Sequence, residues 1–103
     1  MKIVWTDPAV EDLELVKEFI SRGSEFYALR FVTNIFDAVE NLVHFPTRGR
    51  RVPEADDDTI REIIYFPYRI MYRIKPDRIV ILTIIHGARD VGAVSPKPWD
   101  LIS

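Results

Sequence analysis

Between Arg78 and His86 the sequence contains a nearly unbroken run of aliphatic residues, and few folds can accommodate such a run in a chain of 103 residues. The run consists of Ile79, Val80, Ile81, Leu82, Ile84 and Ile85. A strand that is apolar on both faces is typical of a central strand covered on both sides. The rest of the chain is therefore expected to pack around residues 78–86.

The two segments before this run predict two further strands. From Tyr68 to Ile74, apolar and aromatic residues alternate with Arg69, Met71 and Arg73, which predicts a strand with one apolar face and one largely basic face. The turn at Lys75-Pro76-Asp77 indicates a hairpin, because proline presets the backbone angle φ and aspartate can accept local hydrogen bonds. Phe66-Pro67 separates an earlier strand at Arg61–Tyr65 in the same way. Residues 61–90 thus predict an antiparallel meander.

The N-terminal half predicts a short strand and two helices. Lys2–Trp5 alternates like a strand and is expected to join the same sheet. Asp7 is a candidate N-cap and Pro8 fits the first helical position of a helix that ends near Gly23. Its expected buried stripe is Val10, Leu13, Val16, Phe19 and Ile20. Ser24 can cap a second helix that Pro46 ends. Its stripe is Ala28, Val32, Ile35, Val39 and Leu42.

A short link between two amphipathic helices implies an antiparallel helical hairpin, and the apolar face of the sheet is the surface that can cover its stripes. The predicted fold class is α+β, with a two-helix antiparallel hairpin packed on a twisted antiparallel sheet in the order β-α-α-β-β-β. The length favours a single domain over residues 1–103, with a short irregular tail from about residue 91.

The long connection from Thr47 to Thr59 is open to two interpretations. It contains a basic segment, Arg48-Gly49-Arg50-Arg51, followed by an acidic one at residues 54–58. Opposite charges of this kind are typical of a solvated, mobile loop. Alternatively, the basic segment extends a basic patch on the open face of the sheet.

Composition narrows the classes of function. The chain has no cysteine and only two isolated histidines, His44 and His86, so we expect no disulfide, no metal site and no cofactor. It has no apolar leader and no apolar run of the roughly 20 residues that a membrane span needs, which predicts a cytoplasmic protein without a membrane partner. Residues 1–60 carry 12 acidic and 7 basic side chains, whereas residues 61–103 carry 4 and 7, so the sheet end is the basic end.

Four arginines on or beside the strands are the candidate target-binding residues: Arg61, Arg69, Arg73 and Arg89. Guanidinium groups bind phosphate or carboxylate through two parallel hydrogen bonds. The alternative is that these arginines pair with Glu62, Asp90 and the acidic helices. Such internal pairing is expected more for Arg61 and Arg73 than for Arg69 and Arg89. His86, at the end of its strand, is either a general acid or base or a structural residue that bonds the neighbouring backbone. Tyr65 and Tyr72 are expected in the core with satisfied hydroxyls.

These segments resemble the ParE/RelE superfamily of bacterial toxins from type II toxin-antitoxin pairs. The resemblance rests on YRIMYRI at residues 68–74, the strand after it and HGARD at residues 86–90. The TDPAVEDL helix start, Phe45-Pro46, the GRRVPE stretch and Arg61-Glu62 follow in the family's order. The resemblance implies the fold derived above.

The resemblance also implies one of two activities. RelE-like members cut messenger RNA on the ribosome, and a nuclease here would use Arg69, Arg89, His86 and Tyr72. ParE-like members are associated with poisoning DNA gyrase. Residues 63–66 are Ile-Ile-Tyr-Phe where the nucleases carry lysines, and residues 90–95 contain no tyrosine. Arginine is a poor acid or base near pH 7. The resemblance is therefore closer to the ParE-like branch, and no catalytic residue is assigned.

Three hypotheses follow for partners and activity. The first is a toxin that inhibits DNA gyrase by protein binding and is neutralised by a cognate antitoxin in a hetero-oligomer. The second is a ribosome-dependent endoribonuclease acting on messenger RNA, and the third is a degenerate, non-toxic member. An antitoxin is expected to lay an apolar-faced segment along the helical hairpin and the sheet edge, with acidic residues at the basic end.

Overall fold

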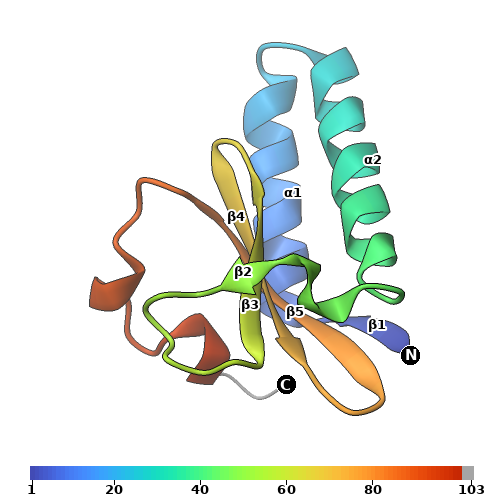
Figure 1. The fold of residues 1–103 in the computed structure, drawn as a ribbon. Coiled ribbons are helices and arrows are strands. Elements are labelled where there is room, and N and C mark those ends of the chain that lie inside the picture. Colours follow the sequence, from blue (N-terminus) through green and yellow to red (C-terminus); the bar gives the residue numbers. More distant parts are fainter. Residues whose placement is uncertain (101–103) are drawn as a thin grey trace.

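Five strands form one sheet in the order β1-β5-β4-β3-β2, and two helices lie side by side against it (Figure 1). The computed structural model describes residues 1–100. Its elements are β1 (Lys2–Trp5), α1 (Asp7–Ser21), α2 (Glu25–Asn41), β2 (Arg50–Arg51), β3 (Ile60–Tyr65), β4 (Tyr68–Ile74) and β5 (Arg78–His86). Short 3-10 turns lie at Pro46–Arg48, Val91–Ala93 and Pro98–Asp100. The predicted α+β class and the predicted β-α-α-β-β-β order are confirmed, with β2 as an addition.

The predicted meander is confirmed, and β5 is the central strand. Strands β3, β4 and β5 pair antiparallel in sequence order. The N-terminal strand departs from the prediction of an antiparallel sheet, because β1 pairs parallel with β5, from Lys2 beside Arg78 to Trp5 beside Ile81. The parallel direction is possible because the helical hairpin and three strands, β2, β3 and β4, lie between β1 and β5 in the chain and provide the long crossover that a parallel pair requires.

The first helix is placed as predicted but is capped and oriented differently. Thr6, rather than Asp7, is the N-cap: its hydroxyl accepts a hydrogen bond from the Ala9 amide at 3.2 Å and donates one to the Ile81 carbonyl at 2.9 Å. The buried face centres on Ala9 and Leu13. Val10 and Phe19, which the sequence placed in the buried stripe, are 39% and 65% exposed, because they lie at the margins of that face.

The second helix follows the prediction closely and forms the core on the helix side of the sheet. The Ser24 hydroxyl accepts a hydrogen bond from the Tyr27 amide at 3.2 Å, as expected for an N-cap. Phe31 packs edge-on against the rings of Tyr65 and Tyr68, with centroids 5.6 and 5.5 Å apart. The buried residues of this core are Ala9, Leu13, Phe31, Ile35, Val39, Leu42, Ile70, Tyr72, Ile79, Ile81 and Ile84.

The opposite face of the sheet is covered, and the prediction of an open, largely basic face is wrong. A second buried cluster consists of Val52, Ile60, Met71, Val80, Leu82, Ile85 and Val91, with Trp99 packed against it. Its cover comes from the connection between α2 and β3 and from the tail, which runs on the side away from the helices (Figure 1). The connection is therefore only partly the solvated loop that was predicted: residues 53–59 are mostly exposed, but the connection also contributes β2 and buries Val52, which is 1% exposed. The last three residues of the predicted domain and its tail, 101–103, lie outside the described residues.

A bulge in β5 lets this strand serve both cores. Met71 pairs with Thr83 but Tyr72 pairs with Ile81, so Leu82 is an extra residue on β5. The bulge turns Ile84 to the helix side, whereas strict alternation would place it on the other face with Leu82. The carboxylate of Asp12 in α1 accepts hydrogen bonds from the Thr83 hydroxyl and the Ile84 amide, at 2.5 and 3.1 Å. Asp12 thus fixes α1 against the irregular part of β5.

No helix within residues 1–100 is both long enough and apolar enough to cross a membrane.

We expect Leu82→Ala to destabilise the fold sharply, because Leu82 is 1% exposed in the second core. Truncating a buried leucine costs on the order of 2 to 5 kcal/mol. The matched control is Leu15→Ala, since Leu15 is 64% exposed on α1 and its loss should cost less than about 0.5 kcal/mol. Thermal unfolding of both variants measures the difference, and equal melting temperatures would show that Leu82 is not a core residue. Arg73 is a weaker control, because its guanidinium binds the tail.

Candidate functional site

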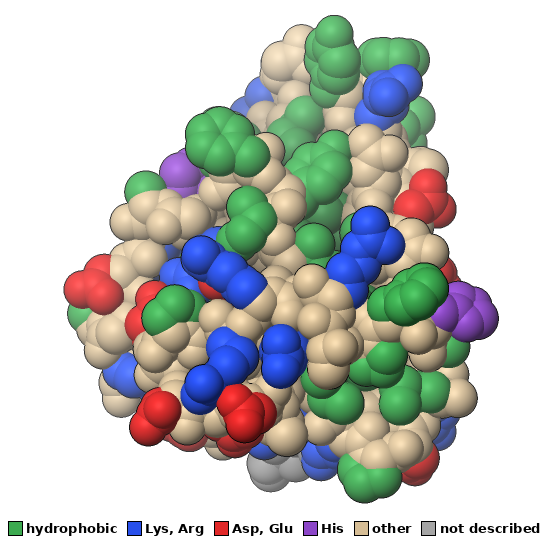
Figure 2. Space-filling view, viewed as in Figure 1, with side chains coloured by type: hydrophobic (Ala, Val, Ile, Leu, Met, Phe, Trp, Pro, Cys, Tyr) green, Lys and Arg blue, Asp and Glu red, His purple; other side chains and the backbone are tan. Residues whose placement is uncertain are grey.

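A groove of about 570 Å³ lies at the end of the sheet where β3 turns into β4. Its apolar walls are Ile64, Phe66, Pro67, Tyr68 and Ala88. Its polar residues are Arg50, Glu54, Arg69 and His86. We call this the end groove. Figure 2 shows this side of the molecule, where basic side chains gather around β2 with hydrophobic side chains beside them.

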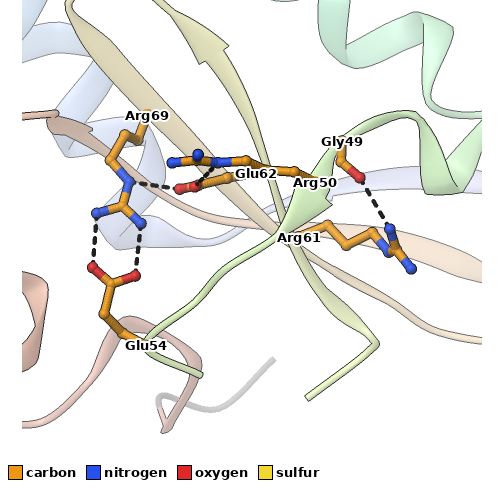
Figure 3. A network of polar contacts seen from close by, with 6 residues as sticks. All are labelled: Gly49, Arg50, Glu54, Arg61, Glu62 and Arg69. Atoms are coloured by element: carbon orange, nitrogen blue, oxygen red, sulfur yellow. Dashed lines mark hydrogen bonds and ion pairs between the residues drawn. The ribbon is translucent and has the colours of Figure 1, made fainter. Parts of the chain in front are cut away.

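Arg69 forms one wall of the end groove and is held by two carboxylates (Figure 3). Its Nε donates to Glu62 Oε1 at 2.6 Å, and its two terminal nitrogens donate to the two oxygens of Glu54 at 3.1 and 2.9 Å. Glu62 is fully buried, and its other oxygen accepts a hydrogen bond from Arg50 Nε at 2.6 Å. We call these four residues the Arg69 network. It ties β2, β3, β4 and the connection before β3 together.

The network shifts the ionisation of its members. The fork of hydrogen bonds from Arg69 lowers the pKa of the Glu54 carboxyl below its ordinary value. The same bonds raise the pKa of Arg69 further, so the guanidinium stays charged. From the sequence, such pairing was expected least for Arg69 and Arg89. For Arg69 this expectation is wrong, because its side chain is 9% exposed and each of its three nitrogens donates to a carboxylate.

Arg61 and Arg73 also bind within the chain, but to backbone carbonyls and Asp57 rather than to the predicted partners, which were Glu62, Asp90 and the acidic helices. Arg61 donates to the Asp58 and Gly49 carbonyls, each at 3.1 Å. Arg73 donates to the Trp99 carbonyl at 2.8 Å and lies 3.9 Å from an Asp57 oxygen. These arginines fasten the connection and the tail to the sheet. Neither lines the end groove.

Arg89 and His86 are the two predicted site residues that face solvent at this end. The Arg89 amide donates to the His86 carbonyl at 3.0 Å, and its guanidinium makes no hydrogen bond or ion pair with any residue of 1–100. His86 Nδ1 accepts a hydrogen bond from the Ala88 amide at 3.1 Å, and its ring packs edge-on to Tyr68. The predicted backbone bond of His86 is thus confirmed. Its Nε2 is the nitrogen left to face a ligand.

Tyr72 is a structural residue, as expected from its place in the apolar stripe. It is 0% exposed, and its hydroxyl accepts from the Gly49 amide at 3.0 Å and donates to the Pro46 carbonyl at 2.6 Å. Burial raises the pKa of this phenol. A Cβ on Gly49 would lie 2.6 Å from the Tyr72 oxygen, so the connection needs glycine there. Tyr72 therefore has no proton to exchange with a ligand in the end groove.

Four residues of the site were not singled out from the sequence. Arg50 and Glu54 lie in the connection whose sequence was open to two interpretations, and their role depends on β2, which is too short to give a periodic signal. Ile64 and Phe66 lie in a strand and turn that were correctly predicted, but their exposure of 49% and 89% depends on where the cover of the sheet ends. The sequence feature that could have indicated an exposed aromatic residue here is the pair of bulky residues, Tyr65 and Phe66, directly before Pro67.

Comparisons with known proteins agree with this architecture. A family model described as the ParE toxin of the type II toxin-antitoxin system parDE matches residues 3–91. Toxin RelE2 of Caulobacter vibrioides is 32% identical over 89 residues, which cover 85% of this chain and 97% of that protein. Putative toxin Y4kP of Sinorhizobium fredii is 33% identical over 88 residues, with 84% and 88% covered. A solved structure described as the chromosomal ParDE TA system from P. aeruginosa matches with a TM-score of 0.67 and 25% identity, over 84% of this chain and 95% of that one.

The arrangement of two helices on one face of an antiparallel meander is that of the ParDE neighbour of known structure, and it places the chain among the small α+β toxin domains. The chain belongs to the ParE family of type II toxin-antitoxin toxins.

We expect Arg69→Ala and Arg89→Ala to separate a structural arginine from an exposed one. Removing Arg69 leaves the buried Glu62 with Arg50 alone, and breaking a buried pair costs about 3 to 5 kcal/mol. Glu62 would keep its ion pair with Arg50, so we expect a loss of stability at the lower end of that range. Arg89→Ala should leave the melting temperature nearly unchanged. Denaturant unfolding of both variants measures this, and an unaffected Arg69→Ala protein would contradict the role given to the network.

We expect the Glu54 carboxylate to make stability depend on acid pH. Because the pKa of folded Glu54 lies below its unfolded value of about 4.5, its contribution is fully present above that pH and is lost as the pH falls through the folded pKa. Glu54→Gln should therefore be less stable than the parent at neutral pH and lose less stability on acidification. Glu14→Gln, at an exposed position on α1, is the control. Melting temperatures measured from pH 7 down to about pH 3 test this, and parallel curves for parent and Glu54→Gln would contradict it.

Proposed function

We propose that this toxin acts in the cytoplasm by binding a protein target, DNA gyrase, rather than by cutting messenger RNA. The observation that carries this proposal is the engagement of two of the four candidate nuclease residues within the fold. The Arg69 fork is filled by Glu54, and the Tyr72 hydroxyl is filled by two backbone groups. All three nitrogens of Arg69 already donate to carboxylates, and both hydrogen-bonding positions of the Tyr72 hydroxyl are used, so neither side chain is arranged to receive a phosphate or a 2′-hydroxyl.

The two remaining candidate nuclease residues, His86 in the end groove and Arg89 at its rim, favour binding over chemistry. Cleavage of RNA needs one group to activate the 2′-hydroxyl and another to protonate the leaving oxygen. His86 offers a single free ring nitrogen, and Arg89 is a poor proton donor near pH 7. Arg50, Glu54 and Arg69 in the groove are paired with one another or with Glu62, and the other walls are largely apolar, which suits contact with a protein surface.

The exposed apolar residues of the helical hairpin support a protein antitoxin as the neutralising partner. Six large apolar side chains on α1 and α2 are more than 40% exposed: Leu15, Phe19, Phe26, Tyr27, Leu29 and Phe36. An amphipathic segment that folds on binding would cover such residues. The neighbour of known structure is described as a ParDE TA system, a likeness that supports a toxin-antitoxin hetero-oligomer here.

Induction of the protein alone tests the proposed function. Growth arrest with loss of supercoiling and DNA damage is the expected result. Cleaved transcripts would instead support a RelE-like, ribosome-dependent endoribonuclease, a candidate favoured by the similarity to toxin RelE2 and by the exposure of His86 and Arg89. Normal growth at high expression would indicate a non-toxic member of the family.

We expect Arg89→Ala to relieve toxicity without loss of folding. Arg89 is the one predicted target-binding arginine whose guanidinium has no partner within residues 1–100. Arg89→Lys should retain part of the toxicity, because it keeps the charge and loses the planar fork. The control is Arg22→Ala, since Arg22 is an exposed cation at the end of α1. Growth after induction at equal protein level measures the effect, and full toxicity of Arg89→Ala would place the target-binding surface elsewhere.

A further inference from the structure

The outer edge of β3 is unpaired beside the end groove. Strand β2 pairs with only two residues of β3, as Arg50 lies opposite Glu62 and Arg51 opposite Arg61. The Ile60 carbonyl accepts from the Val52 amide, so residues 60, 62 and 64 direct their backbone groups toward β2. Ile64 lies two residues beyond Glu62, the last residue of β3 that pairs with β2. Within residues 1–100, no strand pairs with its outward N–H and C=O groups.

Apolar side chains surround this free edge. Ile64 is 49% exposed, and Phe66, two residues further, is 89% exposed. Both line the end groove, whose volume of about 570 Å³ is large enough for at least one large side chain. An open strand edge with exposed apolar residues is a site where another extended chain can pair.

The charges around the groove select the kind of chain. Within the Arg69 network, two arginines face two glutamates, so the network has no net charge. Arg89 follows Ala88 at the rim and has no counter-charge within residues 1–100. The rim therefore favours an acidic group over a basic one. The balanced network and the apolar walls argue against a nucleic acid, which needs several unpaired cations.

We propose that an extended segment of the antitoxin pairs with Ile64 in line with β2, places an apolar side chain in the end groove, and sets a carboxylate against Arg89. The proposal rests on the proposed function, because it requires an antitoxin. It adds a second contact area to that on the helical hairpin. Two main-chain hydrogen bonds to Ile64 give register, and the groove gives side-chain selectivity.

The probe is the protein encoded by the reading frame adjacent to that of this chain. We expect it to form a complex in which the amide of Ile64 exchanges hydrogen with solvent far more slowly than in the free toxin. Phe66→Ala should weaken the complex about tenfold or more, as for an aromatic anchor at a protein interface. Ile64→Lys should weaken it comparably, since it places an unpaired charge in an apolar groove.

The matched control is Phe45→Ala, because Phe45 is 61% exposed but does not line the end groove. This variant should bind within about twofold of the parent, as expected for a residue outside the interface. Melting temperatures equal to that of the parent show that each variant is folded.

The possible results separate this proposal from the proposed function. If the neighbouring protein neither binds nor relieves growth arrest, an antitoxin partner is refuted, and this inference with it. If it binds and relieves arrest while the Ile64 amide exchanges as in the free toxin and Phe66→Ala binds normally, only the placement of the segment is refuted. Protection of Ile64 in the isolated toxin that grows with its concentration would instead assign the edge to a second copy of the chain, which also overturns the proposal.

Discussion

The burial of β5 on both faces is the constraint on which the rest of the structure depends. Its aliphatic side chains need two covers, and a chain of 103 residues has one helical hairpin to offer. The second cover is assembled from the connection before β3 and the C-terminal tail, pieces with little regular structure. The bulge at Leu82 divides the strand's side chains between the two covers, and Asp12 satisfies the amide next to the bulge.

The Arg69 network holds the less regular cover in place and so shapes the functional end of the molecule. A buried carboxylate, Glu62, is stable because two guanidinium groups share it. One of these two guanidinium groups, that of Arg69, also donates from its two terminal nitrogens to the Glu54 carboxylate and so holds Glu54 in place. The arginine that the resemblance associates with phosphate chemistry thus serves as an internal cross-link, while the neighbouring rim keeps Arg89 free for a partner.

The molecule then presents two apolar surfaces with different shapes. The helical hairpin offers exposed residues at helical spacing, which suit an amphipathic helix. The end groove offers an open strand edge with Ile64 and Phe66, which suits an extended segment. A partner that folds on binding can engage both at once, which raises its affinity without a large preformed interface. Reversible neutralisation of a small toxin is well served by such a partner.

The sequence alone determined the three strands of the meander, the two helices, the Ser24 cap and the α+β class, because each depends on periodicity and turn residues that are local in the chain. It also indicated that His86 bonds nearby backbone and that Tyr72 lies in the core. Only the tertiary structure decided the parallel direction of β1, the second cover of the sheet and the partners of Arg69. Strands β1 and β5 are far apart in the chain, and the energies of these features come from burial and charge pairing. The partners of Arg69 are only 7 and 15 residues away, but they lie on the adjacent strand β3 and in the connection before it. Which carboxylate binds Arg69 therefore depends on strand register and on the path of the connection, so the Arg69 network and the end groove appear only once the sheet is assembled.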